Sequence, residues 1–195
     1  MKLFKKLMAV ALAGALALTV LTGCGSVVNE KELFNIMQDM APSNPETGEQ
    51  VTLEQGDGSL ARKVFYKLSD FAKDHTYAME KSGDEFFDKV IGSAGGDHSD
   101  AYDYAGLRSI IPEGSKDAYL VRCAEVPEVK NGFLNDVNNM MLADKLMHGT
   151  QDNPITQINP NVANRVDIDK ATVHLYSGKI GEKGYVVCVI VLAAK

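Results

Sequence analysis

The sequence lacks the short motifs by which most catalytic sites are recognised. It contains no His-Glu-x-x-His, Cys-x-x-Cys or His-x-His segment, so it has no compact zinc signature. It also has no Gly-x-Ser-x-Gly elbow and no Ser-x-x-Lys motif, so the usual serine nucleophiles are missing. The aspartates near His98 do not have the spacing of an EF-hand loop. Any catalytic constellation must therefore be assembled from residues that lie far apart in the sequence.

Basic residues are scarce. The 195 residues include 20 Lys and Arg against 26 Asp and Glu, a net charge of −6. A nucleic-acid partner requires a basic surface, so none is expected. Cysteine is also scarce, with three residues at positions 24, 123 and 188.

The first 24 residues follow the pattern of an export signal. Lys2, Lys5 and Lys6 precede a charge-free apolar run of sixteen residues, 7–22, which is short for a membrane span. The segment Leu21-Thr22-Gly23-Cys24 resembles the lipobox of bacterial lipoproteins. The resemblance implies cleavage of the signal peptide 1–23, a diacylglyceryl group on the Cys24 sulfur, and a further acyl chain such as palmitate on the new N-terminus. The mature protein would then be anchored by lipid on the extracytoplasmic side of the cell membrane.

After that cleavage, a short tether (24–28) leads into one domain, residues 29–195. The 172 mature residues are enough for a real core, and too few for the usual two lobes of a solute-binding protein. Because residues 1–23 hold three lysines and no acid, 17 basic and 26 acidic residues remain, a net charge of −9. Electrostatic adhesion to anionic lipid is therefore not expected, and the acyl chains must supply the anchor.

Helical patterns dominate the first half of the domain. Asn29 with Glu32 forms a capping pattern for a helix that ends before Pro42, and a second helix begins at Ser59 and continues to about residue 80. Ser82 with Glu85 caps a third helix, while 44–58 is predicted to be a polar loop. A further helix over 133–147 is expected to turn three apolar side chains inward, namely Val137, Met140 and Met141.

Strand patterns dominate the second half. Strands are predicted over 118–126, 171–176 and 185–193, the last two flanking a glycine-bearing loop. The last strand is apolar without alternation, so both of its faces must be covered. The sequence therefore predicts an α+β fold with a small antiparallel sheet of about three strands sandwiched between helices.

Few side chains stand out as candidates for chemistry. Cys123 and Cys188 lie in strand-like runs and could form a disulfide or remain buried thiols. His148 follows Asp144 by four residues on one helix face, an arrangement that serves an ordinary ion pair or orients an imidazole for metal binding or catalysis. His98 lies among aspartates in a loop. A solvated loop that caps the next helix is enough to explain this group of residues without a site.

The segment from His148 through Ile158-Asn159-Pro160-Asn161 into two strands resembles the CAP superfamily (cysteine-rich secretory, antigen 5 and pathogenesis-related proteins). The resemblance implies an α–β–α sandwich with a cleft of two histidines and two glutamates. His148 matches a motif position. By order alone, His98 or His75 matches the first histidine and Glu125 the first glutamate, and the Gly-Glu-Asn strand motif is missing. On this resemblance the domain could hold a divalent metal.

Two functions are compatible with these observations. The first is a lipid-anchored, non-enzymatic domain that binds a ligand or an envelope protein and needs no cofactor. The alternative is a cell-envelope hydrolase or metal-binding CAP-like domain built from His98, Glu125, Asp144 and His148. Cys24 is the one residue to which the sequence assigns a definite role, that of the lipidated residue.

Overall fold

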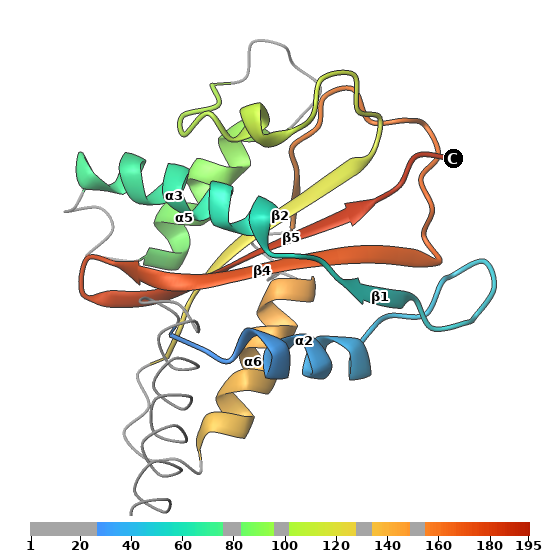
Figure 1. The fold of residues 1–195 in the computed structure, drawn as a ribbon, viewed down its shortest axis with the longest axis horizontal. Coiled ribbons are helices and arrows are strands. Elements are labelled where there is room, and N and C mark those ends of the chain that lie inside the picture. Colours follow the sequence, from blue (N-terminus) through green and yellow to red (C-terminus); the bar gives the residue numbers. More distant parts are fainter. Residues whose placement is uncertain (1–26, 76–82, 96–101, 128–133, 149–154) are drawn as a thin grey trace, which may run out of the picture.

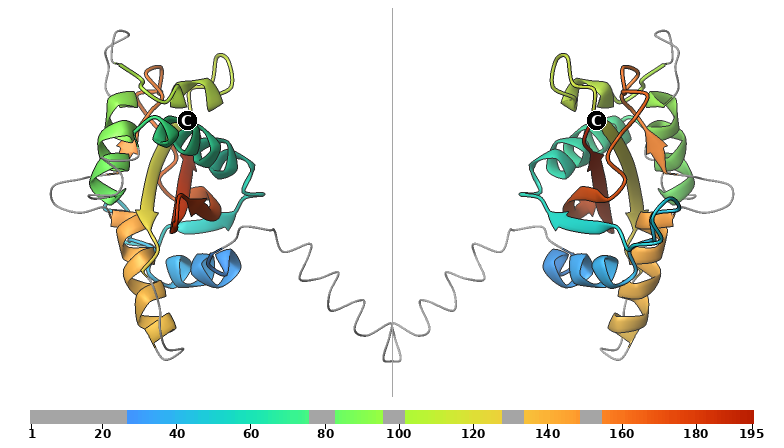
Figure 2. Two further views of the ribbon diagram at one scale, coloured as in Figure 1. Left: turned by 90° about the vertical axis from the view of Figure 1, so that its left-hand side faces the viewer. Right: turned by 90° about the vertical axis from the view of Figure 1, so that its right-hand side faces the viewer.

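A five-stranded mixed sheet lies between two layers of helices (Figures 1 and 2). The computed structural model describes residues 27–75, 83–95, 102–127, 134–148 and 155–195. Within these ranges the strands are β1 (Thr52–Gln55), β2 (Ala118–Glu125), β3 (Thr156–Gln157), β4 (Lys170–Ile180) and β5 (Lys183–Leu192). They are hydrogen-bonded in the order β1-β4-β5-β2-β3. The α+β class is confirmed. The expected sheet of about three antiparallel strands is too small.

The two strands that the sequence did not predict lie at the edges of the sheet. β1 pairs in parallel with β4, with Thr52 opposite Lys170, so the sheet is mixed and not purely antiparallel. β1 lies within the stretch predicted to be a loop, and only Leu53 of its four residues is buried. β3 is two residues long and pairs with Leu120 and Val121 of β2. Neither segment carries enough buried apolar surface to produce a strand pattern in the sequence.

The β4–β5 hairpin extends through the segment predicted to be a glycine-bearing loop. Gly178 and Gly184 both lie within the strands, and the turn is reduced to Gly181 and Glu182. A Cβ at Gly178 would be 2.7 Å from the Phe65 ring, and one at Gly184 would be 3.1 Å from a Val27 methyl group. These glycines therefore serve close packing against the sheet, a use that a turn-based interpretation misses.

Each face of the sheet carries its own core. On one face pack α3 (Ser59–Lys73), α5 (Gly83–Ala94) and the short 3-10 helix η1 (Leu107–Ile110). On the other pack α2 (Glu30–Asp39) and α6 (Leu134–His148). β5 supplies Val187 and Val189 to the first core and Val186, Cys188 and Ile190 to the second. The prediction that both faces of this strand are covered is confirmed.

The predicted helix starts at Asn29 and Ser59 are confirmed. The predicted inward face of the 133–147 helix is wrong. The Asn29 side chain accepts a hydrogen bond from the Glu32 N–H at 3.2 Å, and α3 begins at Ser59. In α6, however, Leu142, Ala143 and Leu146 are buried, whereas the three residues expected inward are half exposed: Val137, Met140 and Met141. α6 carries apolar side chains on both faces, so periodicity alone could not decide which face packs.

The two described cysteines are free, buried thiols. Cys123 lies opposite Val187 and Cys188 lies opposite Arg122 on the paired strands β2 and β5. Cys123 belongs to the core under α5, whereas Cys188 belongs to the core under α2 and α6. Because their side chains point to opposite faces of the sheet, the disulfide considered from the sequence does not form.

Candidate functional site

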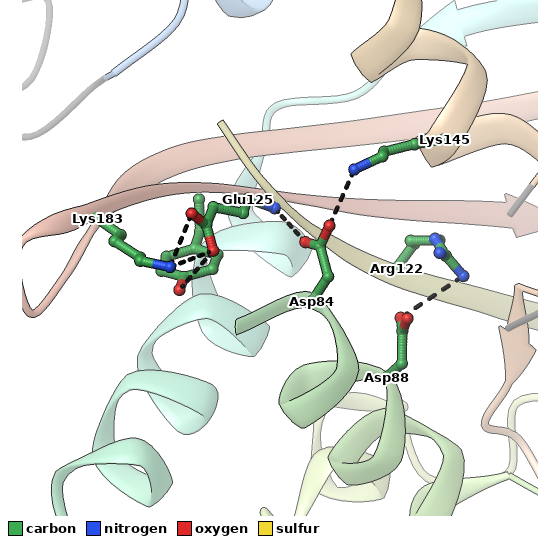
Figure 3. A network of polar contacts seen from close by, with 7 residues as sticks. Asp84, Asp88, Arg122, Glu125, Lys145 and Lys183 are labelled. Atoms are coloured by element: carbon green, nitrogen blue, oxygen red, sulfur yellow. Dashed lines mark hydrogen bonds and ion pairs between the residues drawn. The ribbon is translucent and has the colours of Figure 1, made fainter. Parts of the chain in front are cut away.

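A network of charged side chains closes the outer edge of β2 (Figure 3). β3 pairs only with the middle of β2, so the backbone toward Glu125 would present unpaired groups. The Asp84 carboxylate, at the start of α5, accepts the Glu125 N–H at 2.6 Å and lies 2.9 Å from Lys145 Nζ on α6. One carboxylate thus joins helices from the two opposite layers around the strand edge.

An ion pair lies deeper along the same edge. Arg122 Nη1 on β2 lies 3.6 Å from the carboxylate of Asp88 on α5, and the two side chains are 6% and 8% exposed. Burial raises the pKa of Asp88 to about 6, although the Arg122 guanidinium acts in the opposite direction. A buried pair of this kind fixes the register of α5 against β2 because either charge alone would be costly to bury.

Glu125 is held at the end of β2 by two partners from β5. Lys183 Nζ lies 3.0 Å from its carboxylate, and the Tyr185 hydroxyl donates to the same group at 3.4 Å. Burial, together with the Glu125 charge, raises the pKa of Tyr185, so the hydroxyl remains a proton donor. Gly83 lies against this hydroxyl, and a Cβ there would be 2.1 Å from it.

A groove opens beside Glu125, at the end of the sheet where the β4–β5 hairpin turns. It has a volume of about 310 Å³ and is lined by the chain entry, the end of β2 and the hairpin: Val27, Glu125, Val126, Pro127, Lys179, Glu182, Lys183 and Gly184. The lining combines apolar side chains with two acids and two lysines. Its volume is at the lower end of the range for small-molecule sites.

The chain enters the fold at this groove. The Val27 N–H donates to Ser177 Oγ on β4 at 3.2 Å, and Glu30 accepts from the Ser177 N–H and hydroxyl at 2.7 and 3.0 Å. Ser177 follows Val173 and Leu175 on the face that carries α2 and α6. The N-terminal segment is thus fixed to the sheet before the first helix begins.

The residues predicted to form a cleft are not assembled into one. Asp144 and His148 do pair, with 3.0 Å between Oδ1 and Nδ1, on an outward face of α6 where their side chains are 59% and 48% exposed. Glu125 instead binds Lys183 and Tyr185 on the other side of the sheet. Among the described residues, no group of three or more His, Cys, Asp and Glu is arranged to hold a metal ion. His98 and Cys24 lie outside the described residues.

The edge network was not anticipated from the sequence. Its members Asp84, Asp88, Arg122 and Lys145 come from three separate elements. One signal was available, because Arg122 interrupts an otherwise apolar strand and a buried arginine requires a carboxylate. Asp84 and Asp88 are four residues apart and therefore share a face of α5, which makes them the natural partners.

Comparison with known proteins identifies no relative: no family model matches the chain, and no curated protein or solved structure matches it at a significant level. The resemblance to the CAP superfamily, which covers residues 33–192 in outline and the C-terminal part in more detail, therefore stays a prediction. Within the described ranges, none of the helices has the length and apolar content that a membrane crossing requires.

Proposed function

We propose that this chain is an extracytoplasmic lipoprotein, anchored through Cys24, whose domain binds a ligand or an envelope protein at the groove beside Val27 without catalysing a reaction. The observation that supports the proposal is the position of Val27. It is three residues from Cys24, it is hydrogen-bonded to Ser177, and it lines the groove. A lipidated Cys24 would therefore hold this end of the domain at the membrane surface.

The groove suits binding better than chemistry. Its carboxylate, Glu125, is paired with Lys183 at 3.0 Å and accepts from Tyr185, so it is neutralised and held in place. A general acid or base requires a carboxyl group that is free to reach the substrate. Mixed charges and apolar side chains around a small hollow instead favour recognition of a polar group on a partner.

The anchor is tested by the chemistry of the mature N-terminus. Mass spectrometry of the protein from membranes should show a chain that begins at Cys24 and carries diacylglyceryl and acyl groups. Cys24→Ser should remain unprocessed or be released into the aqueous fraction. An unmodified Cys24 in a membrane-bound protein would contradict the proposal.

The groove is tested by photo-crosslinking in intact cells. A benzophenone amino acid in place of exposed Lys179 should give a discrete adduct. The matched control places the same group at Tyr66, which is 56% exposed on α3, in the other helix layer, and should give none. No adduct at position 179 in correctly lipidated protein would overturn the assignment of the groove.

The alternative, a cell-envelope hydrolase or metal site, needs His98, Glu125, Asp144 and His148 in one cleft. Of the three that the structure describes, Glu125 is engaged with Lys183 and Tyr185, and the other two are engaged with each other. No observation on the described residues favours this alternative.

A further inference from the structure

α6 exposes a short apolar stripe on its outer face, which ends one turn before the Asp144–His148 ion pair on the same face. Val137, Met140 and Met141 are 50%, 54% and 58% exposed, and their i, i+3, i+4 spacing places them on one side of the helix. The buried side of the same helix is formed by other residues, Leu142, Ala143 and Leu146. The outer face of α6 is therefore apolar around Met140 and charged around Asp144.

The exposed stripe lies in the helix layer formed by α2 and α6, the same layer to which the N-terminal end of the domain is attached. α6 packs with α2 on one face of the sheet, and its N-terminal half projects beyond that layer (Figure 1). Val27 is bound to Ser177, which faces this same layer. Val27 also shares the groove with Pro127, the last described residue before α6 begins at Leu134.

Distance limits where the membrane can lie if Cys24 is lipidated. Three residues of extended chain span about 10 Å, so the bilayer surface must lie within about that reach of Val27. The tethered domain therefore has one end at the membrane, and α6 begins seven residues after Pro127, which lines the groove at that end.

We propose that Val137, Met140 and Met141 of α6 lie against the lipid bilayer that holds Cys24. This inference rests on the lipid anchor proposed above. Three half-exposed side chains would bind a free protein to a membrane only weakly, but the anchor makes docking an intramolecular step with a high effective concentration. The contact is apolar. This fits a mature chain of net charge −9, because such a chain has no net electrostatic attraction to anionic lipid.

The test uses the mature lipidated protein reconstituted in phosphatidylethanolamine–phosphatidylglycerol vesicles. Met141→Cys is labelled with a polarity-sensitive nitrobenzoxadiazole group, and the native thiols at 123 and 188 are buried and do not compete. We expect a blue-shifted emission that spin-labelled lipids quench. The matched control is Tyr104→Cys, since Tyr104 is 59% exposed, and it lies beyond the opposite face of the sheet, where the label should report water.

A charge-insertion variant tests the stripe itself. Val137→Glu with Met140→Glu, labelled at 141, should lower the docked-to-free ratio by about tenfold or more, because a charged side chain is costly to move from water to the apolar part of the bilayer. Tyr102→Glu adds a charge at a residue that is 78% exposed on the other layer and should change nothing. Both glutamates are added at exposed positions, and a thermal melt checks that the variant remains folded.

The outcomes separate this inference from the anchor. Vesicle flotation with lipid on Cys24, combined with a water-like label at 141, would overturn bilayer docking and leave the anchor intact. Failure to float, with Cys24 unmodified, would overturn the anchor. A blue shift without lipid quenching, or one that grows with protein density on the vesicle, would assign the stripe to a second copy of the chain and overturn the bilayer contact.

Discussion

The carboxylate of Asp88 on α5 and the guanidinium of Arg122 on β2 lie 3.6 Å apart, and both side chains are more than nine-tenths buried. Each charge stabilises the other in the interior, where an isolated charge is costly to bury. This pair and the Asp84–Lys145 bridge, with 2.9 Å between its charged atoms, hold both helix layers to one strand edge.

Removing one member of the buried pair should be costly. Arg122→Met alone should lower the free energy of unfolding by about 3–5 kcal/mol, because the Asp88 carboxylate stays buried without the guanidinium at 3.6 Å. Asp88→Leu alone should also lower it, because Arg122 loses this carboxylate. The double variant should recover most of this loss, since two apolar side chains can pack in the same place. Urea unfolding of the four proteins forms the cycle, and additive losses in the double variant would show that the two residues do not interact.

The same pair should make stability depend on pH. The folded state raises the pKa of Asp88 from 3.8 to about 6 through burial, so the folded protein retains this proton over a range in which the unfolded chain has lost it. The contribution of Asp88 is therefore fully present below about pH 4 and is lost as pH rises through about 6.

The comparison that isolates this effect is with Asp88→Asn, which has no proton to lose. Relative to that variant, the wild type should lose about 2–3 kcal/mol of unfolding free energy between pH 4 and pH 7. Thermal or urea melts at matched ionic strength measure the difference. A difference that is flat across this range, or that favours the wild type as pH rises, would contradict the assignment.

Gly83 should not tolerate a side chain. A Cβ there would be 2.1 Å from the Tyr185 hydroxyl and 2.9 Å from a Glu125 oxygen, so Gly83→Ala should destabilise the protein by about 1–3 kcal/mol. Adding Tyr185→Phe removes the nearest atom and should restore part of the loss. Gly92→Ala is the matched control in the same helix, because a Cβ there meets nothing within 4 Å. It should be neutral or slightly stabilising.

The two buried thiols should be chemically silent in the folded protein. Burial raises the pKa of Cys123, and it raises the pKa of Cys188 to about 12, so neither forms the reactive thiolate at neutral pH. A thiol reagent should label both residues only after denaturation. Reducing and non-reducing gels should give the same mobility, and rapid labelling of native protein would show that one strand is open.

Local sequence signals predicted local structure well in this chain. The Asn29 cap and the unalternating apolar run of β5 each depend on neighbours within a few residues, and both are confirmed. β1 could not be predicted in this way, because it exists only through pairing with β4, more than a hundred residues later in the chain. Its own sequence, Thr-Leu-Glu-Gln, is that of an exposed edge.

The candidate site was predictable only in part. Glu125 was correctly placed at the end of a strand, but its partners Lys183 and Tyr185 follow from the register of β2 against β5, which the sequence does not state. In α6 the choice of face failed because Met140 and Met141 are as apolar as Leu142 and Leu146. Which of two apolar faces packs is decided by the neighbouring elements and not by the helix.

The attachment of the N-terminal segment to β4 has a consequence for the order of folding. Val27 and Glu30 form hydrogen bonds with Ser177, and the Thr52 N–H donates to the Asp169 carbonyl. The start of the domain therefore cannot complete these contacts until residues 169–177 have been synthesised. Contacts of such high sequence separation form late because a long loop must close first. We therefore expect the end of the domain that carries the groove to fold last. In a chain truncated before β4, Val27 and Glu30 lack Ser177 and this end does not form.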